Sequence, residues 1–251
     1  MSIWGKIVGG AAGFAVGGPL GAILGAVAGH AVDKMAEDSK PPGDDGGTGA
    51  SNDPTRRIAF TIAVIVLGAK MAKADGHVTK DEIAAFRQVF HIPPEEVKNV
   101  GRLFDQARRD ANGFEPYAKQ IARLFRDRPA VLEELLDGLF HIARADGHVT
   151  PEELDYLQAV ANIFGLDEAA WHRLKAANLG PDAEDPYHIL GVTRETVPEA
   201  IKAAYRKLIR ENHPDRLVAE GMPQEFVAMA NEKMAKINVA YDRICKEKGI
   251  S

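Results

Sequence analysis

Residues 205–216 read YRKLIRENHPDR, and this stretch decides the fold of the C-terminal region. It continues an amphipathic pattern that begins at Pro198, so we predict a helix from Pro198 to about Asn212. Pro214 ends this helix, because proline has no amide proton and biases His213 away from helical backbone angles. The apolar stripe of the helix consists of Ile201, Ala204, Tyr205, Leu208 and Ile209.

A second long helix is predicted to begin near Met222-Pro223 and to end at about Lys248. Two helices of opposite direction joined by a short loop form a helical hairpin, and the tripeptide at 213–215 then lies at its tip. A short helical element precedes the hairpin at 185–192, DPYHILGV, where Asp-Pro begins it and glycine ends it. The inward-facing residues of the second helix are predicted to be Phe226, Met229, Ile237, Ala240, Tyr241 and Ile244.

The first hairpin helix also carries a basic face. Lys202, Arg206 and Arg210 follow one another at four-residue spacing, and Lys207 lies at the edge. Four cations without interleaved acids form a surface suited to an acidic partner. The alternative is an ordinary polar turn beside a solvated helix. A His-Asp catalytic dyad is not supported, because no nucleophile or set of metal ligands accompanies it.

Composition restricts the class of protein. With 251 residues, 45% of them apolar, the chain can form packed domains and is not disordered throughout. A formal net charge of -5 argues against general nucleic-acid binding. The single cysteine, Cys245, excludes an intramolecular disulfide and a thiolate metal cluster. We therefore expect no enzyme activity, no cofactor, no metal and no nucleic acid.

The N-terminal segment predicts a membrane anchor over residues 1–34. Residues 7–32 contain no Asp, Glu, Lys or Arg, and a helix of that length rises roughly 39 Å, more than the roughly 30 Å hydrocarbon core of a bilayer. Glycines recur at every fourth position and form a stripe where two helices can approach closely, so we expect a homodimer. The predicted contact residues are Gly9, Gly13, Gly17, Gly21 and Gly25.

Two alternatives stay open for this segment. Lys6, the apolar run and Ala26-Val27-Ala28 resemble a signal peptide with its cleavage site. A soluble glycine-rich oligomerisation helix is the other alternative, because Gly and Ala insert into lipid less readily than Leu and Pro19 interrupts the run. The flanking charges are too few to fix the orientation in the membrane.

Two polar stretches divide the rest of the chain. Residues 39–55 read SKPPGDDGGTGASNDPT, which predicts a flexible linker assigned to 35–53. Gly180-Pro181 lies in a second linker, 180–184. Between the linkers, residues 54–179 show apolar residues at three- and four-residue spacing, which predicts a helical bundle. The predicted fold class is all-α.

The bundle contains an internal repeat. AKADGHVT at 72–79 returns as ARADGHVT at 143–150, and each copy predicts a turn between two helices. The threonine that ends each copy begins the next helix as part of a capping box. The capping pairs are Thr79 with Glu82 and Thr150 with Glu153.

Calcium binding is the alternative interpretation of these turns, because they match the second half of an EF-hand loop. The carboxylates of the first half are missing, since its first and third positions fall on Met71 and Lys73 in the first copy. His77 and His148 lack the short-range partner spacing of zinc sites, so exposed turn histidines are favoured.

Two resemblances follow from these motifs. The repeated corners of 54–179 resemble the TerB-like domain, named for a tellurite-resistance protein. Residues 185–251 resemble the J domain of DnaJ-type co-chaperones, in DPYHILGV, YRKLIRENHPDR and KINVAYDRI. That resemblance implies a partner, a DnaK-type heat-shock chaperone, whose ATP hydrolysis the J domain stimulates. The residues that it implies for contact are His213, Pro214, Asp215, Lys202, Arg206, Lys207 and Arg210.

The order of anchor, linker, TerB-like bundle and J domain resembles the DjlA-type co-chaperones of bacterial inner membranes, and MSIWGKIVGGAAGFAVGGPLGAILGA is similar to their anchor. The resemblance implies a single-pass protein with both domains in the cytoplasm, because a cleaved signal peptide would separate the J domain from its ATP-dependent partner. The chain lacks the Gly/Phe-rich and cysteine-rich regions of general DnaJ proteins, which argues against independent client holding. A metal- or stress-responsive membrane module led by the TerB-like domain, with the J domain secondary, is the alternative function.

Overall fold

The computed structural model describes residues 18–22, 54–74, 92, 97–110, 113–145, 147–179 and 185–250. Every element of regular secondary structure within these ranges is a helix, which confirms the predicted all-α fold class. The N-terminal group of helices is α4 (Pro54–Ala74), α6 (Val97–Arg109), α7 (Glu115–Leu124), α8 (Pro129–Ala143), α9 (Pro151–Phe164) and α10 (Glu168–Leu179). The C-terminal group is α11 (Pro186–Leu190), α12 (Pro198–Glu211), α13 (Pro214–Ala219), the 3-10 turn η2 (Gln224–Phe226) and α14 (Val227–Lys248).

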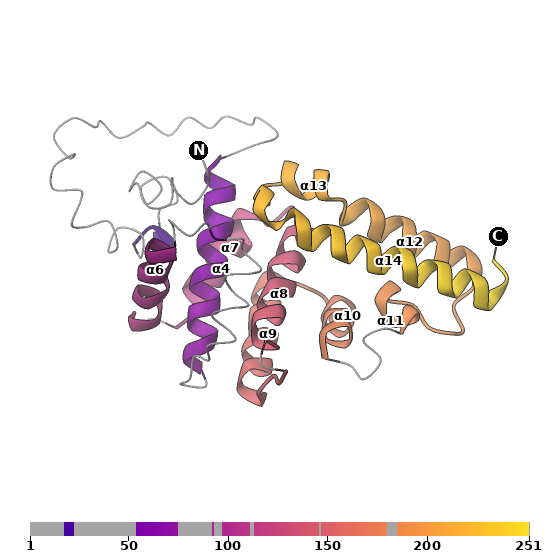
Figure 1. Ribbon diagram of the computed structural model, residues 1–251, viewed down its shortest axis with the longest axis horizontal. Coiled ribbons are helices and arrows are strands. Elements are labelled where there is room, and N and C mark those ends of the chain that lie inside the picture. The colour runs from indigo at the N-terminus through magenta and orange to yellow at the C-terminus, as the bar shows by residue number, and fades with distance from the viewer. Residues whose placement is uncertain are drawn as a thin grey trace.

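Helix α4 forms the centre of the bundle, and α6, α7, α8 and α9 pack around it (Figure 1). Its side chains from Ile58 to Ala72 are buried almost without exception, as expected for a helix that is apolar on all sides. Lys70 is a buried charge on this helix, and its Nζ atom lies 2.9 Å from the carboxylate of Asp110. The hydroxyl group of Tyr156 donates a hydrogen bond to the carbonyl oxygen of Leu67 at 2.8 Å, which ties α9 to α4.

The second copy of the repeat forms the predicted corner between α8 and α9. The Thr150 hydroxyl accepts a hydrogen bond from the amide of Glu153 at 3.2 Å, and the Glu153 carboxylate accepts one from the amide of Thr150 at 2.9 Å. This capping box is confirmed, and a cap of this kind contributes about 1 kcal/mol. Gly147 adopts a φ of 88°, a left-handed conformation that favours glycine. The capping pair predicted for the first copy, Thr79 with Glu82, lies outside the described residues.

Helices α12 and α14 lie side by side and form the predicted hairpin (Figure 1). The rings of Tyr205 and Tyr241 stack between them, with centroids 3.9 Å apart and planes 8° from parallel. Helix α14 begins at Val227, later than predicted, because a 3-10 turn precedes it. The hairpin and α11 enclose a small core made of Tyr187, Leu190, Ile201, Leu208, Ile237, Ala240 and Ile244.

Two residues predicted to face inward in the hairpin pack elsewhere. Phe226 is 2% exposed and belongs to the core of the α4–α10 bundle, and the half-buried Met229 packs against the same core. Figure 1 shows the reason, since α13 and the start of α14 form the end of the hairpin that meets the bundle. The sequence pattern identified these positions as buried but assigned them to the wrong core.

The N-terminal segment enters the described part of the chain over residues 18–22 alone. Leu20 is fully buried in the bundle core, and its amide donates a hydrogen bond to Oε1 of Gln120 at 3.0 Å. Gly21 of the predicted glycine stripe is buried there as well. None of the described helices has the length and apolar character needed to cross a membrane. The other members of the predicted stripe, Gly9, Gly13, Gly17 and Gly25, and the predicted linkers 35–53 and 180–184 lie outside the described residues.

Candidate chaperone-docking site

The basic face of α12 points away from the core of the hairpin. Helix α12 buries Ile201 and Leu208 against α11 and α14, so residues on its opposite side stay in solvent. Arg206, Lys207 and Arg210 are exposed, and Lys202 is half-buried. Within the described ranges, no acidic side chain forms an ion pair with Arg206, Lys207 or Arg210. The positive charge predicted for this face is therefore available to an acidic partner.

The tripeptide His213-Pro214-Asp215 lies where α12 gives way to α13. Buried Asn212 ends α12, and its amide group donates a hydrogen bond to the carbonyl oxygen of Leu208 at 2.9 Å. His213 is the N-cap of α13, because its Nδ1 atom accepts a hydrogen bond from the amide of Asp215 at 3.2 Å. The side chain of Asp215 is 95% exposed. The site therefore presents a carboxylate to solvent from a capped helix end.

The segment after Pro214 is a helix and not the simple loop that the sequence suggested. Pro214 occupies the first turn of α13, where its missing amide proton costs no hydrogen bond. Asp215 also lies in that turn, where the positive end of the helix dipole stabilises a carboxylate. Helix α13 is held in place by Leu217 in its second half, which is fully buried. The orientation of Asp215 is thus set by a short ordered element.

Arg216 is a further cation of this site that the sequence interpretation left out. Its Nε atom lies 2.6 Å from the Glu220 carboxylate, and its Nη1 atom donates a hydrogen bond to the carbonyl oxygen of Arg210 at 3.4 Å. The hydrogen bond and the charge of Glu220 raise the pKa of Arg216. The side chain therefore joins the end of α12 to α13. Its position directly after the tripeptide was a signal that could have identified it.

Leu217 and Met222, two apolar residues on the far side of the tip, were also missed, whereas Phe226 was predicted to be buried but within the hairpin. Leu217, Met222 and Phe226 are each at most 2% exposed, and all three belong to the bundle core. A cluster of apolar residues in a stretch predicted to be a turn was the available signal, because such residues need a core to bury them.

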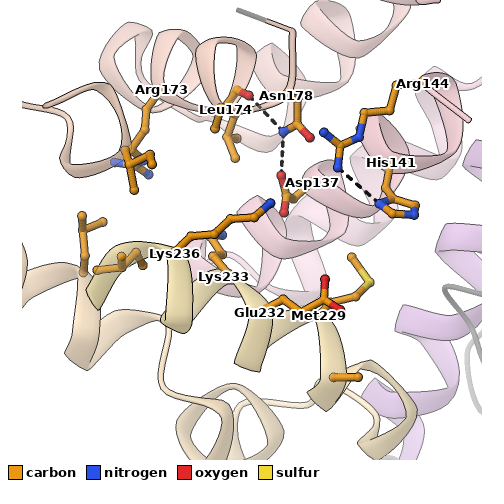
Figure 2. Close-up of a pocket in the computed structure, with 15 residues that line it drawn as sticks. Asp137, His141, Arg144, Arg173, Leu174, Asn178, Met229, Glu232, Lys233 and Lys236 are labelled. Atoms are coloured by element: carbon orange, nitrogen blue, oxygen red, sulfur yellow. Dashed lines mark hydrogen bonds between the residues drawn. The ribbon is translucent and has the colours of Figure 1, made fainter. Parts of the chain in front are cut away.

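A cleft of about 260 Å³ lies between α8 and α10 of the bundle and α14 of the hairpin (Figure 2). The amide group of Asn178 donates a hydrogen bond to the carboxylate of Asp137 at 2.7 Å, and the side chains of Arg144 and His141 lie 3.5 Å apart. Burial lowers the pKa of His141, and the charge of Arg144 lowers it further. Both cations and acids line the cleft, so its charge selects no single class of ligand.

The acidic residue Glu153 at the corner between α8 and α9 caps a helix. Glu153 is 3% exposed, and its Oε2 atom accepts hydrogen bonds from the amide and the hydroxyl group of Thr150. Across the residues that the structure describes, no group of three or more His, Cys, Asp or Glu side chains is arranged to hold a metal ion. Residues 75–79 of the first copy of the repeat, which include His77, and Asp146 of the second copy lie outside those residues.

Comparison with protein families agrees with this geometry. Residues 185–249 match the family model described as DnaJ domain, so the hairpin with its exposed tip is a J domain. Residues 61–176 match the model described as tellurite resistance protein TerB, and residues 1–52 match that of the co-chaperone DjlA transmembrane domain.

Similar proteins extend the match to nearly the whole chain. The co-chaperone protein DjlA of Aliivibrio fischeri is 34% identical over 100% of both chains. The DjlA protein of Photobacterium profundum is 32% identical over 98% of this chain and 99% of its own length. That of Vibrio cholerae is also 32% identical, over 100% of both chains. The chain belongs to the DjlA co-chaperone family, which confirms the resemblance found in the sequence. No solved structure matches the chain.

Proposed function

We propose that this chain docks on a DnaK-type heat-shock chaperone through its J domain and stimulates ATP hydrolysis by that chaperone at the cytoplasmic face of the membrane. One observation carries the proposal: Asp215 is 95% exposed at the tip of a J domain, directly after a helix with exposed cations. The role requires no catalytic group in this chain. Its function is to change the conformational equilibrium of a partner that hydrolyses ATP.

Two kinds of contact are expected at this site, long-range electrostatic attraction and one close ion pair. The exposed cations of α12 attract an acidic surface over a distance and raise the rate of encounter. Asp215 then forms a close, charge-assisted pair with an arginine of the chaperone. This pair favours the hydrolysing state if it forms more strongly in that state than in the resting one. We expect the full-length chain in nanodiscs to bind an ATP-loaded chaperone saturably. Empty nanodiscs are the control, and binding no greater than theirs would contradict the proposal.

Replacing Arg206 by Ala is expected to weaken stimulation without abolishing it. The side chain is exposed, and exposed charge pairs contribute about 0.2–1 kcal/mol, so we expect a loss of about 1.4- to 5-fold at low salt. The difference from the native chain should shrink as salt screens the charges. Rates of chaperone ATP hydrolysis at about 50 and about 300 mM salt measure both effects. Lys246→Ala, an exposed cation on α14, is the matched control, and an equal loss in that variant would refute a specific role for the α12 face.

We also propose that the N-terminal segment anchors the chain in the bacterial inner membrane as a single span and pairs two chains through its glycine stripe. This arrangement requires Leu20 and Gly21 to leave the bundle core in which they are buried here. The match of residues 1–52 to the transmembrane domain of the DjlA family supports the anchor. The spacing of the glycines at every fourth position supports the pairing. Both domains would then lie in the cytoplasm, where ATP and the chaperone are present.

Replacing Gly17 by Leu is expected to weaken this dimer, because a large side chain in a glycine stripe prevents close approach of two helix backbones. Analytical ultracentrifugation of the full-length chain in detergent measures the change, and we expect the monomer fraction to rise. Ala15→Leu, two positions away and off the stripe, is the control. A native chain that is monomeric, or a variant that dimerises as strongly as the native chain, would exclude the stripe as the contact.

A further inference from the structure

The segment that follows the exposed tip of the J domain is buried in the core of the TerB-like bundle. The seven buried residues of the J-domain core come from α11, α12 and α14, and none of them lies between α12 and residue 230. The apolar residues of that intervening segment instead join the core of the TerB-like bundle. These residues are Leu217, Met222, Phe226 and Ala230, each 2% exposed or less.

Close packing shows that this contact is specific. The ring of Phe226 meets that of Phe60 edge to face, with centroids 4.8 Å apart and planes at 81°. Phe60 in turn makes an edge contact with Phe125 at 6.2 Å. At Gly221, where φ is 112°, an added Cβ atom would lie 3.0 Å from Cβ of Arg56 and 3.1 Å from the ring of Phe125. The chain after α13 therefore passes so close to the bundle that a glycine is required.

Polar contacts extend the same interface on both sides of Phe226. Arg128, at the start of α8, donates a hydrogen bond to the carbonyl oxygen of Glu220 at 2.8 Å. Lys233 of α14 pairs with Glu134 of α8, with Nζ and Oε2 3.0 Å apart. The side chain of Glu134 is fully buried, so this pair lies inside the contact. Lys233 and Met229 are seen on the bundle side of α14 in Figure 2.

We infer that the TerB-like bundle is a positioning element for the J domain, because it supplies the core that orders α13 and the start of α14 and thereby fixes Asp215. Leu217 is two residues from Asp215 and fully buried, whereas Asp215 itself remains 95% exposed. The bundle thus contacts the tip through Leu217 and leaves Asp215 exposed to the chaperone. Docking on a partner then costs less ordering entropy than it would for a loose tip.

The inference is tested by loosening the tip without touching the exposed site. Phe226→Ala and Met222→Ala each remove a side chain that belongs to the bundle core and not to the J-domain core. Val239→Ala, a 52% exposed valine on the same α14, is the matched control. Hydrogen exchange in the full-length chain in detergent should accelerate at least about ten-fold over residues 213–222 in the two tip variants. Exchange over 198–211 and 239–248 should stay at the native rate, because those residues belong to the J-domain core.

The second readout is stimulation of ATP hydrolysis, which rests on the proposed function. The co-chaperone concentration for half-maximal stimulation should rise about ten-fold in the tip variants, while the rate at saturation is kept, because Asp215 and the cations are unchanged. Unchanged exchange over 213–222 would overturn the inference. Faster exchange with unchanged or improved half-saturation would overturn positioning as the role of the contact. No stimulation by the native chain would refute the proposed function, and the exchange comparison would still decide whether the bundle orders the tip.

Discussion

Asp215→Asn is expected to lower stimulation of chaperone ATP hydrolysis by at least about 30-fold while leaving the fold intact. Loss of one partner from a close charge pair between proteins costs about 2–5 kcal/mol, and 2 kcal/mol corresponds to about 30-fold. The fold should survive, because the carboxylate is 95% exposed and the hydrogen bond that orders this turn comes from the backbone amide of the same residue. Single-turnover hydrolysis with the chaperone in excess of ATP measures the loss, and circular dichroism checks the fold.

The matched control for this variant is Asp242→Asn. Asp242 is an exposed aspartate on α14, three-quarters of the helix away from the tip. The Asp242→Asn substitution removes the same charge from the same domain, so a general effect of net charge would appear in both variants. Native stimulation by Asp215→Asn, or equal losses in the two variants, would show that Asp215 is not the contact.

Lys233→Met is expected to lower the free energy of unfolding by about 3–5 kcal/mol, because it leaves a buried carboxylate without its partner. The Glu134 side chain is fully buried, and its Oε1 atom has no hydrogen-bond partner among the described residues. Burial raises the pKa of Glu134, and Lys233 only partly offsets that effect. Burial lowers the pKa of Lys233, but Glu134, Asp137 and Glu133 together outweigh it and raise that pKa. Urea unfolding of the full-length chain in detergent measures the change.

The pH dependence gives this prediction a definite sign. A carboxyl group whose pKa is raised by folding binds protons more tightly in the folded state than in the unfolded one. Loss of Lys233 raises the pKa of Glu134 further, so the variant should regain stability as the pH falls from about 8 toward about 5. Its deficit relative to the native chain should therefore narrow at low pH. A deficit that is constant across this range would show that the buried charge is not its cause.

A double variant separates charge from packing at the same position. Glu134→Leu combined with Lys233→Met replaces the ion pair by apolar side chains, and such replacements are often neutral or stabilising. We expect the free energy of unfolding of the double variant to be at most about 1 kcal/mol below that of the native chain, or to exceed it. A double variant less stable than Lys233→Met alone would contradict the assigned role of the pair.

The helical hairpin and its exposed site were predictable from local sequence. The proline after His213 determines where α12 ends, and the spacing of Ile201 and Leu208 determines which face is buried. The cations lie on the opposite face for the same reason. The cap formed by Thr150 was also predictable, because a capping box depends on residues three positions apart.

The contact between the two domains was not predictable in this way. Burial of Phe226 was predicted from its apolar character, but the ring that packs against it is that of Phe60, far away in the sequence. A periodic pattern identifies a buried face and not the element that packs against it. The burial of Glu134 was not predictable either, because its acidic side chain breaks the apolar pattern and its partner lies ninety-nine residues away.

The most direct test of the central claim uses the native chain. Single-turnover hydrolysis of ATP bound to a purified DnaK-type chaperone is followed while full-length chain in nanodiscs is added over a range of concentrations. We expect the rate of hydrolysis to rise with concentration and then to saturate, because docking through the tip is a binding step. A rate that stays at the level given by empty nanodiscs at every concentration would contradict it.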